Sequence, residues 1–208
     1  MNGLELFARG RLSDIGPTVL ATLMNRAPPD NPNVVTSVAS ILADVQNRGD
    51  QALLEMAERF DEVVLKGLEV PSSAWKKANN ALDPRVRAAL ERAARNIRAF
   101  HETQIPDEVS LDVEPGVRIT RAWAPLQRIG VYAPGGRAAY PSSVLMGVIP
   151  AKAAGVGEVL VCSPPGPSGS PPDEVLAACA VAGADRLFAI GGAGAVAALA
   201  EGGVARLA

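Results

Sequence analysis

The sequence predicts an α/β protein in which a helical region, residues 1–127, precedes a parallel β-α-β-α-β-α unit, residues 128–208. Three observations support this prediction. Apolar residues recur at helical spacing through the first hundred positions, short apolar runs replace that spacing from Arg128 onward, and a turn rich in glycine or proline follows each run. Short, almost wholly apolar strands are typical of a parallel sheet that helices cover on both faces.

The composition narrows the class of protein. With 48% hydrophobic residues the chain can form a sizeable core, and a net charge of -2 provides no basic footprint for nucleic acid or an anionic membrane. Because no apolar run is long enough to span a bilayer and no signal-peptide pattern opens the chain, we expect a cytoplasmic protein. Cys162 and Cys179 are expected to be buried, unpaired thiols. A single histidine, His101, excludes a metal site built on several histidines.

The first half contains clear helix boundaries. Gly49 is expected to end the helix formed by residues 34–48, and Asp50 is placed to cap the next one. Further along, Asp83 is a candidate N-cap, and Pro84 follows at the first helical position, where a missing N–H costs no hydrogen bond. The helix that follows has an apolar stripe, formed by Val86, Leu90, Ala93, Ile97 and Phe100.

Residues 105–127 connect the two halves and contain Pro115-Gly116, which predicts the turn of a small hairpin or an edge strand. Beyond them, strands are expected at 129–132, 158–162 and 187–190, and helices at 142–154, 173–182 and 193–201. Three strands alone are expected to leave open edges and an uncovered apolar face, so we expect the chain to self-associate. The alternative is that the N-terminal helices fold back and cover the sheet.

Three strand-to-helix turns are expected at one edge of this Rossmann-like unit, where ligands bind in open parallel sheets. The first turn could hold a phosphate, with Ser142 or Ser143 capping the helix and Arg137 adding charge. None of the turns matches G-x-G-x-x-G or the P-loop pattern, and any such connection needs glycine or proline. Tyr132 lies at the end of its strand, where a tyrosine is more often a packing residue with an exposed hydroxyl than a ligand contact. The residues alone therefore leave a nucleotide role and a purely structural role open.

The stretch "IGVYAPGGRAAYPSSVLMGVIPAKAAGV", which begins at Ile129, resembles the histidinol dehydrogenase family. The pattern is specific, with V-Y-x-P-G-G followed by Y-P-S-S-V-L-M and P-A-x-x-A-G-V. Further segments resemble the family in the same order, namely Asp44 to Asp61, Asn96 to Gln104 and Ile190 to Ala200. The resemblance covers nearly the whole chain.

This resemblance implies a zinc-dependent enzyme that oxidises L-histidinol to L-histidine with two NAD, in the last step of histidine biosynthesis. It also implies a homodimer and a fold related to aldehyde dehydrogenases. Tyr132 matches a tyrosine that contacts NAD in the family, and Pro134, Gly135 and Gly136 belong to the same motif. Gly194 stands where the family has an NAD-contacting glutamine, so its side chain cannot supply an amide.

The family's catalytic Glu-His pair and its zinc ligands, a glutamine, two histidines and an aspartate, have no counterpart in this sequence. We therefore assign no catalytic and no metal-binding residue, and we expect the chain alone to be inactive. Two hypotheses follow, the N-terminal part of a histidinol dehydrogenase or a truncated, non-catalytic binding or interaction module of the same fold. An unrelated Rossmann-like enzyme is disfavoured because the similar segments occur in order.

Overall fold

The computed structural model describes residues 11–24, 31–135 and 138–201. The chain divides into two compact units, residues 1–37 and 38–208. These compact units do not test the domain boundary predicted between residues 127 and 128. That boundary stays a prediction. The first unit has three described elements, namely η1 (Leu12–Asp14), α1 (Pro17–Met24) and the start of α2 (Pro32–Arg48).

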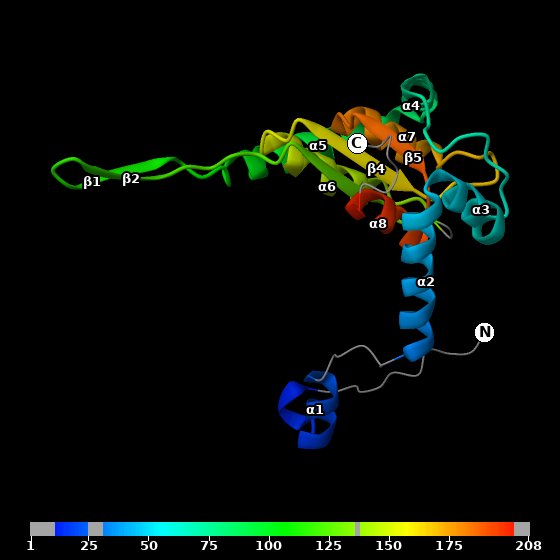
Figure 1. The fold of residues 1–208 in the computed structure, drawn as a ribbon, viewed down its shortest axis with the longest axis horizontal. Helices are drawn as coiled ribbons and strands as arrows, with labels where there is room; N and C mark the ends of the chain where they lie inside the picture. The colour runs from blue at the N-terminus through cyan, green and yellow to red at the C-terminus, as the bar shows by residue number, and fades with distance from the viewer. Residues whose placement is uncertain (1–10, 25–30, 136–137, 202–208) are drawn as a thin grey trace. The chain divides into compact units, whose positions relative to one another are not determined.

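The second unit contains the remaining described elements, shown in Figure 1. Its helices, after the end of α2, are α3 (Asp50–Asp61), α4 (Ser72–Ala81), α5 (Pro84–Glu102), α6 (Pro141–Ala153), α7 (Asp173–Ala182) and α8 (Gly192–Glu201). Its strands are β1 (Val109–Glu114), β2 (Val117–Arg121), β3 (Arg128–Tyr132), β4 (Glu158–Ser163) and β5 (Arg186–Ala189). The order confirms the predicted α/β fold, although α4 was not predicted. No helix in the described ranges is long and apolar enough to cross a membrane.

The parallel sheet has the order β3-β4-β5, and helices cover both of its faces. Side chains of β4 alternate between two cores, as a strand requires. Val159 and Val161 belong to the core shared with α6 and α7, whereas Leu160 and Cys162 belong to the core shared with α3 and α8. Figure 1 shows α7 and α8 on opposite sides of the sheet. The prediction of an uncovered apolar face is therefore wrong, because α6 and α7 cover one face and α8 with α3 covers the other, while α4 and α5 pack against α7 and α6.

A segment far earlier in the chain pairs with one edge of the sheet. The N–H of Val70 donates to the carbonyl of Leu187 over 2.8 Å, and the N–H of Ala189 donates to the carbonyl of Leu68 over 2.7 Å. The bridge between Glu69 and Phe188 is antiparallel. This pairing satisfies backbone groups that the free edge of β5 would otherwise leave exposed.

The predicted helix boundaries are confirmed at α5 and wrong at α3. The Asp83 carboxylate accepts a hydrogen bond from the N–H of Arg85 over 2.7 Å, and Pro84 is the first residue of α5. At α3, however, Gly49 is the N-cap, with φ at 56°, and Asp50 is already helical. Glycine suits this position because the left-handed backbone is strained for other residues.

Candidate functional site

The candidate site is the edge of the parallel sheet at which β3, β4 and β5 all end. In register, Tyr132 lies beside Cys162, and Cys162 lies beside Phe188, so the three following turns start at the same level. The first turn continues through Pro134 and Gly135, both accessible to solvent. This edge is where the sequence analysis predicts that a ligand binds.

A hydrogen bond joins the first and third turns across the site. The hydroxyl oxygen of Tyr132 accepts from the N–H of Gly192 over 3.2 Å. Gly192 is the first residue of α8 and has φ at 60°, a conformation that favours glycine. The phenolic proton of Tyr132 is not used in this bond and remains available as a donor. Tyr132 as a whole is 36% exposed, so a ligand at the edge can reach it.

Pro164, directly after β4, explains two glycines of the neighbouring turns. A Cβ atom at Gly135 would lie 3.1 Å from Cγ and Cδ of Pro164, and one at Gly191 would lie 3.0 Å from its Cβ. Both turns therefore approach the proline ring so closely that a Cβ atom would require the ring or the turn to shift by a few tenths of an ångström. For Gly135 the structure supplies a packing reason that is independent of any ligand.

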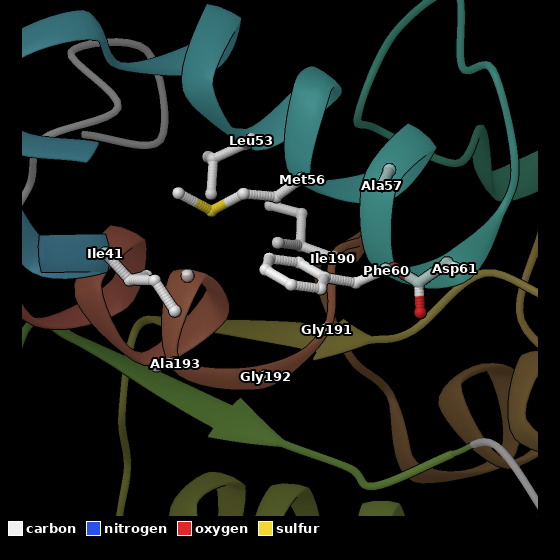
Figure 2. A pocket seen from close by; sticks show the side chains of 11 residues that line it. Ile41, Leu53, Met56, Ala57, Phe60, Asp61, Ile190, Gly191, Gly192 and Ala193 are labelled. Carbon is white, nitrogen blue, oxygen red and sulfur yellow. The ribbon is translucent and has the colours of Figure 1, made fainter. Parts of the chain in front are cut away.

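Gly194 lies in the first turn of α8 and is buried against α3. A Cβ atom there would lie 3.1 Å from Cδ2 of Leu53 and 3.1 Å from Sδ of Met56. The same two side chains line a cavity of about 300 Å³ between α3 and the β5–α8 turn (Figure 2). A larger residue at position 194 would have to displace these side chains or enter the space beside them.

Asp61, at the end of α3, is the one charged residue among those that line this cavity. A Cβ atom at Gly191 would lie 3.6 Å from its Oδ1, which places the carboxylate beside the β5–α8 turn. Burial raises the pKa of the Asp61 carboxyl above its usual range, because desolvation disfavours the charged form. The rest of the lining is apolar or glycine, so the cavity favours an uncharged group of a ligand.

The start of α6 differs from the prediction. Pro141 is the first helical residue and Tyr140 is the N-cap, with no hydrogen bond from its side chain. Ser142 and Ser143 therefore lie inside the first turn, and the prediction that one of them caps the helix is wrong. Gly136 and Arg137, which the sequence also assigned to this turn, lie outside the described residues.

The sequence analysis missed Ser163, the last residue of β4. Its side chain is fully buried, and its hydroxyl has no hydrogen-bond partner among the described residues. A buried polar group without a partner is rare and costly. A serine at the end of an apolar run was the available signal, but the sequence could not show that no neighbour would satisfy it.

The described residues do not form a metal site. They contain no group of three or more histidine, cysteine, aspartate or glutamate side chains placed to hold a metal ion. Nδ1 of His101 is 2.6 Å from Oε1 of Gln104, its neighbour at the end of α5. Cys162 and Cys179 are buried and free, as predicted, and burial raises the pKa of each thiol to about 12.

Comparison with known proteins decides the family. The family model described as histidinol dehydrogenase matches residues 24–206. This chain belongs to the histidinol dehydrogenase family. Histidinol dehydrogenase of Methanosarcina barkeri is 42% identical over 193 residues, which are 92% of this chain and 44% of that protein. Histidinol dehydrogenase of Thermobifida fusca is 46% identical over 179 residues, which are 85% of this chain and 41% of that protein.

The likeness extends to a solved structure of the family. The crystal structure of histidinol dehydrogenase from Elizabethkingia anophelis superposes with a TM-score of 0.80 at 29% sequence identity. The matched region covers 88% of this chain and 42% of the chain in that crystal structure. The chain thus spans less than half the length of the family members it matches.

Proposed function

We propose that this chain forms the NAD-binding part of a histidinol dehydrogenase that oxidises L-histidinol to L-histidine with two NAD. Family membership supports the substrate and the place in histidine biosynthesis. The hydrogen bond between Tyr132 and Gly192 is the single structural observation that supports the site, because it holds two turns at the edge where nucleotides bind.

The described residues fit NAD in part. Tyr132 offers a free hydroxyl proton, and the first turn of α8 offers the positive end of a helix dipole beside a glycine turn. Gly194 offers no side-chain amide, so the binding energy rests on the tyrosine and on backbone groups. NAD, when bound, accepts the hydride, and the chain's own residues orient the dinucleotide.

The described residues do not fit zinc, because no cluster of suitable donors exists among them. We derive no catalytic step through zinc, and we assign no catalytic residue. The alternative function is that of a truncated, non-catalytic binding or interaction module of the same fold. On either assignment, the chain alone is expected to show no NAD reduction with L-histidinol.

Calorimetric titration with NAD tests the proposed site. Tyr132→Phe removes the hydroxyl that holds the Gly192 N–H, and we expect the Kd to rise about 3- to 10-fold, the value of one hydrogen bond. Tyr132→Ala should weaken binding further. Thr120→Val is the matched control, because it also removes one hydrogen-bonded hydroxyl, that of the pair with Ser110 in the β1–β2 hairpin. Unchanged affinity in Tyr132→Ala would contradict the proposal.

A further inference from the structure

Pro164 directly follows β4, the middle strand of the parallel sheet, and is half-buried. Because β3 and β5 flank this strand, the turns that follow them flank the proline as well. A Cβ atom at Gly135 would lie 3.1 Å from Cγ and Cδ of the ring, and a Cβ atom at Gly191 would lie 3.0 Å from its Cβ. One ring therefore packs against both turns of the proposed NAD site.

The backbone conformation of these two glycines does not require glycine. Gly192 has φ at 60°, whereas neither Gly135 nor Gly191 has a positive φ. A residue with a side chain could therefore adopt either backbone conformation. The nearest described atoms that such a side chain would meet belong, at both positions, to Pro164. The close approach of both turns to the ring thus accounts for the two glycines.

Pro164 is also a rigid spacer. Its own ring restricts φ, and the proline that follows it, Pro165, restricts its ψ to the extended region. Pro165 is buried, so a movement of the pair toward solvent would expose apolar surface. The separation between the two turns is therefore set by a residue with little conformational freedom.

The hydrogen bond between Tyr132 and Gly192 depends on that separation. Tyr132 lies three residues before Gly135, and Gly192 directly follows Gly191, so the bond and the two ring contacts lie on the same two segments. The distance of 3.2 Å from the N–H of Gly192 to the Tyr132 hydroxyl oxygen is at the long end of the range for such bonds. A further separation of a few tenths of an ångström would weaken the bond.

We infer that Pro164 is a positioning residue for NAD, because its ring sets the separation of the two turns and so keeps the Tyr132 hydroxyl on the Gly192 N–H. The bond uses the hydroxyl oxygen as acceptor and leaves the phenolic proton for the ligand. Pro164 acts through Tyr132 rather than on the ligand. The inference rests on the proposed NAD site, but the spacing of the turns is measurable without NAD.

The exchange of the Gly192 amide with water, measured by NMR on the 208-residue protein without NAD, reports on this bond. Pro164→Ala should raise the exchange rate about 3- to 10-fold, the value of one hydrogen bond, and Tyr132→Phe should raise it equally. Pro125→Ala is the matched control and should leave the rate unchanged. The Pro125 ring also packs on a glycine, with its Cβ and Cγ 3.5 Å from a Cβ atom at Gly155, but this contact precedes β4. An unchanged rate in Pro164→Ala would overturn the inference.

A steric exchange separates positioning from a general loss of stability. In Gly135→Ala the new methyl group meets the proline ring, so the Gly192 exchange rate and the Kd for NAD should both rise. Pro164→Ala removes Cγ and Cδ and keeps Cβ, which is 3.6 Å from the methyl position. In the double variant the methyl group fills the vacated space, and both values should return toward those of the wild type. A double variant that is worse than either single variant would overturn the inference, and wild-type exchange of β4 amides checks that each variant is folded.

Calorimetric titration connects the spacing with NAD. Pro164→Ala should raise the Kd for NAD about 3- to 10-fold, and adding Tyr132→Phe should weaken binding no further, because both changes remove the same hydrogen bond. Full additivity of the two changes would overturn the role of Pro164 in NAD binding. A wild-type protein that does not bind NAD would refute the proposed function, whereas an unchanged Gly192 exchange rate in Pro164→Ala would refute the spacing role alone.

Discussion

The contact between α6 and β3 leaves no space for a side chain at Gly147. A Cβ atom there would lie 2.5 Å from Cγ1 and 3.1 Å from Cγ2 of Val131, whereas carbon atoms pack best at roughly 3.5–4.0 Å. Val131 is only 8% exposed and its branched side chain has few favourable rotamers, so rotating it away from the helix is costly. In Gly147→Ala the helix must therefore move off the strand by about 1 Å.

The cost of this shift follows from two opposing terms. Overpacking a core costs about 1–3 kcal/mol, and replacing glycine by alanine inside a helix returns up to about 1 kcal/mol. We expect a net loss of about 1–2 kcal/mol in the free energy of unfolding, which lowers Tm by about 2–8 °C in a chain of this size. Without the clash, the substitution would stabilise the helix, so the sign of the change is decisive.

Urea unfolding of the wild type and the variant measures this loss. Gly67→Ala is the control, because a Cβ atom at Gly67 has no atom within 4 Å, and it should change stability by less than about 0.5 kcal/mol. Combining Gly147→Ala with Val131→Ala should cost less than the sum of the two single changes, with a coupling of at least about 0.5 kcal/mol. A Gly147→Ala protein as stable as the wild type would refute the packing argument.

Three further outcomes are expected. Two hydrogen bonds from Arg186 lower the pKa of Glu69. The pair therefore stabilises the fold at pH values above the ordinary glutamate pKa, and this contribution is lost as the pH falls through the lowered pKa. In urea titrations at several pH values, Glu69→Gln should lower the free energy of unfolding by about 0.5 kcal/mol at neutral pH and leave it unchanged in acid. Burial raises the pKa of Asp61, so its charge opposes folding as the pH rises above the ordinary aspartate range, and Asp61→Asn should gain thermal stability relative to the wild type between acid and neutral pH. Cys162 and Cys179 are buried, and their thiols have a pKa of about 12. Both should resist iodoacetamide at pH 8 in the native protein and react only in denaturant, which mass spectrometry detects. Rapid labelling of the folded chain would contradict their burial.

Features that depend on neighbouring residues in the chain were accessible from the sequence. The start of α5 at Asp83 and Pro84 was predicted because a cap and its helix are contiguous. The turn at Pro115-Gly116 and the three apolar strands were predicted for the same reason, since each pattern occupies only a few residues. Tyr132 was also placed correctly, at the carboxyl end of its strand. Its contact with NAD rests on the family and stays a proposal.

Features that join distant segments were decided only by the tertiary structure. Tyr132 and Gly192 are 60 positions apart, and no local sequence pattern predicts that the Tyr132 hydroxyl accepts a hydrogen bond from the N–H of Gly192. The antiparallel pairing of Leu68 and Val70 with β5 spans more than a hundred positions, and it closes an edge that the sequence left open. A glycine in a turn can make room for a ligand or for a neighbouring side chain, and which of the two applies depends on the atoms that the fold brings within about 3–4 Å. At Gly135 the neighbour is the ring of Pro164.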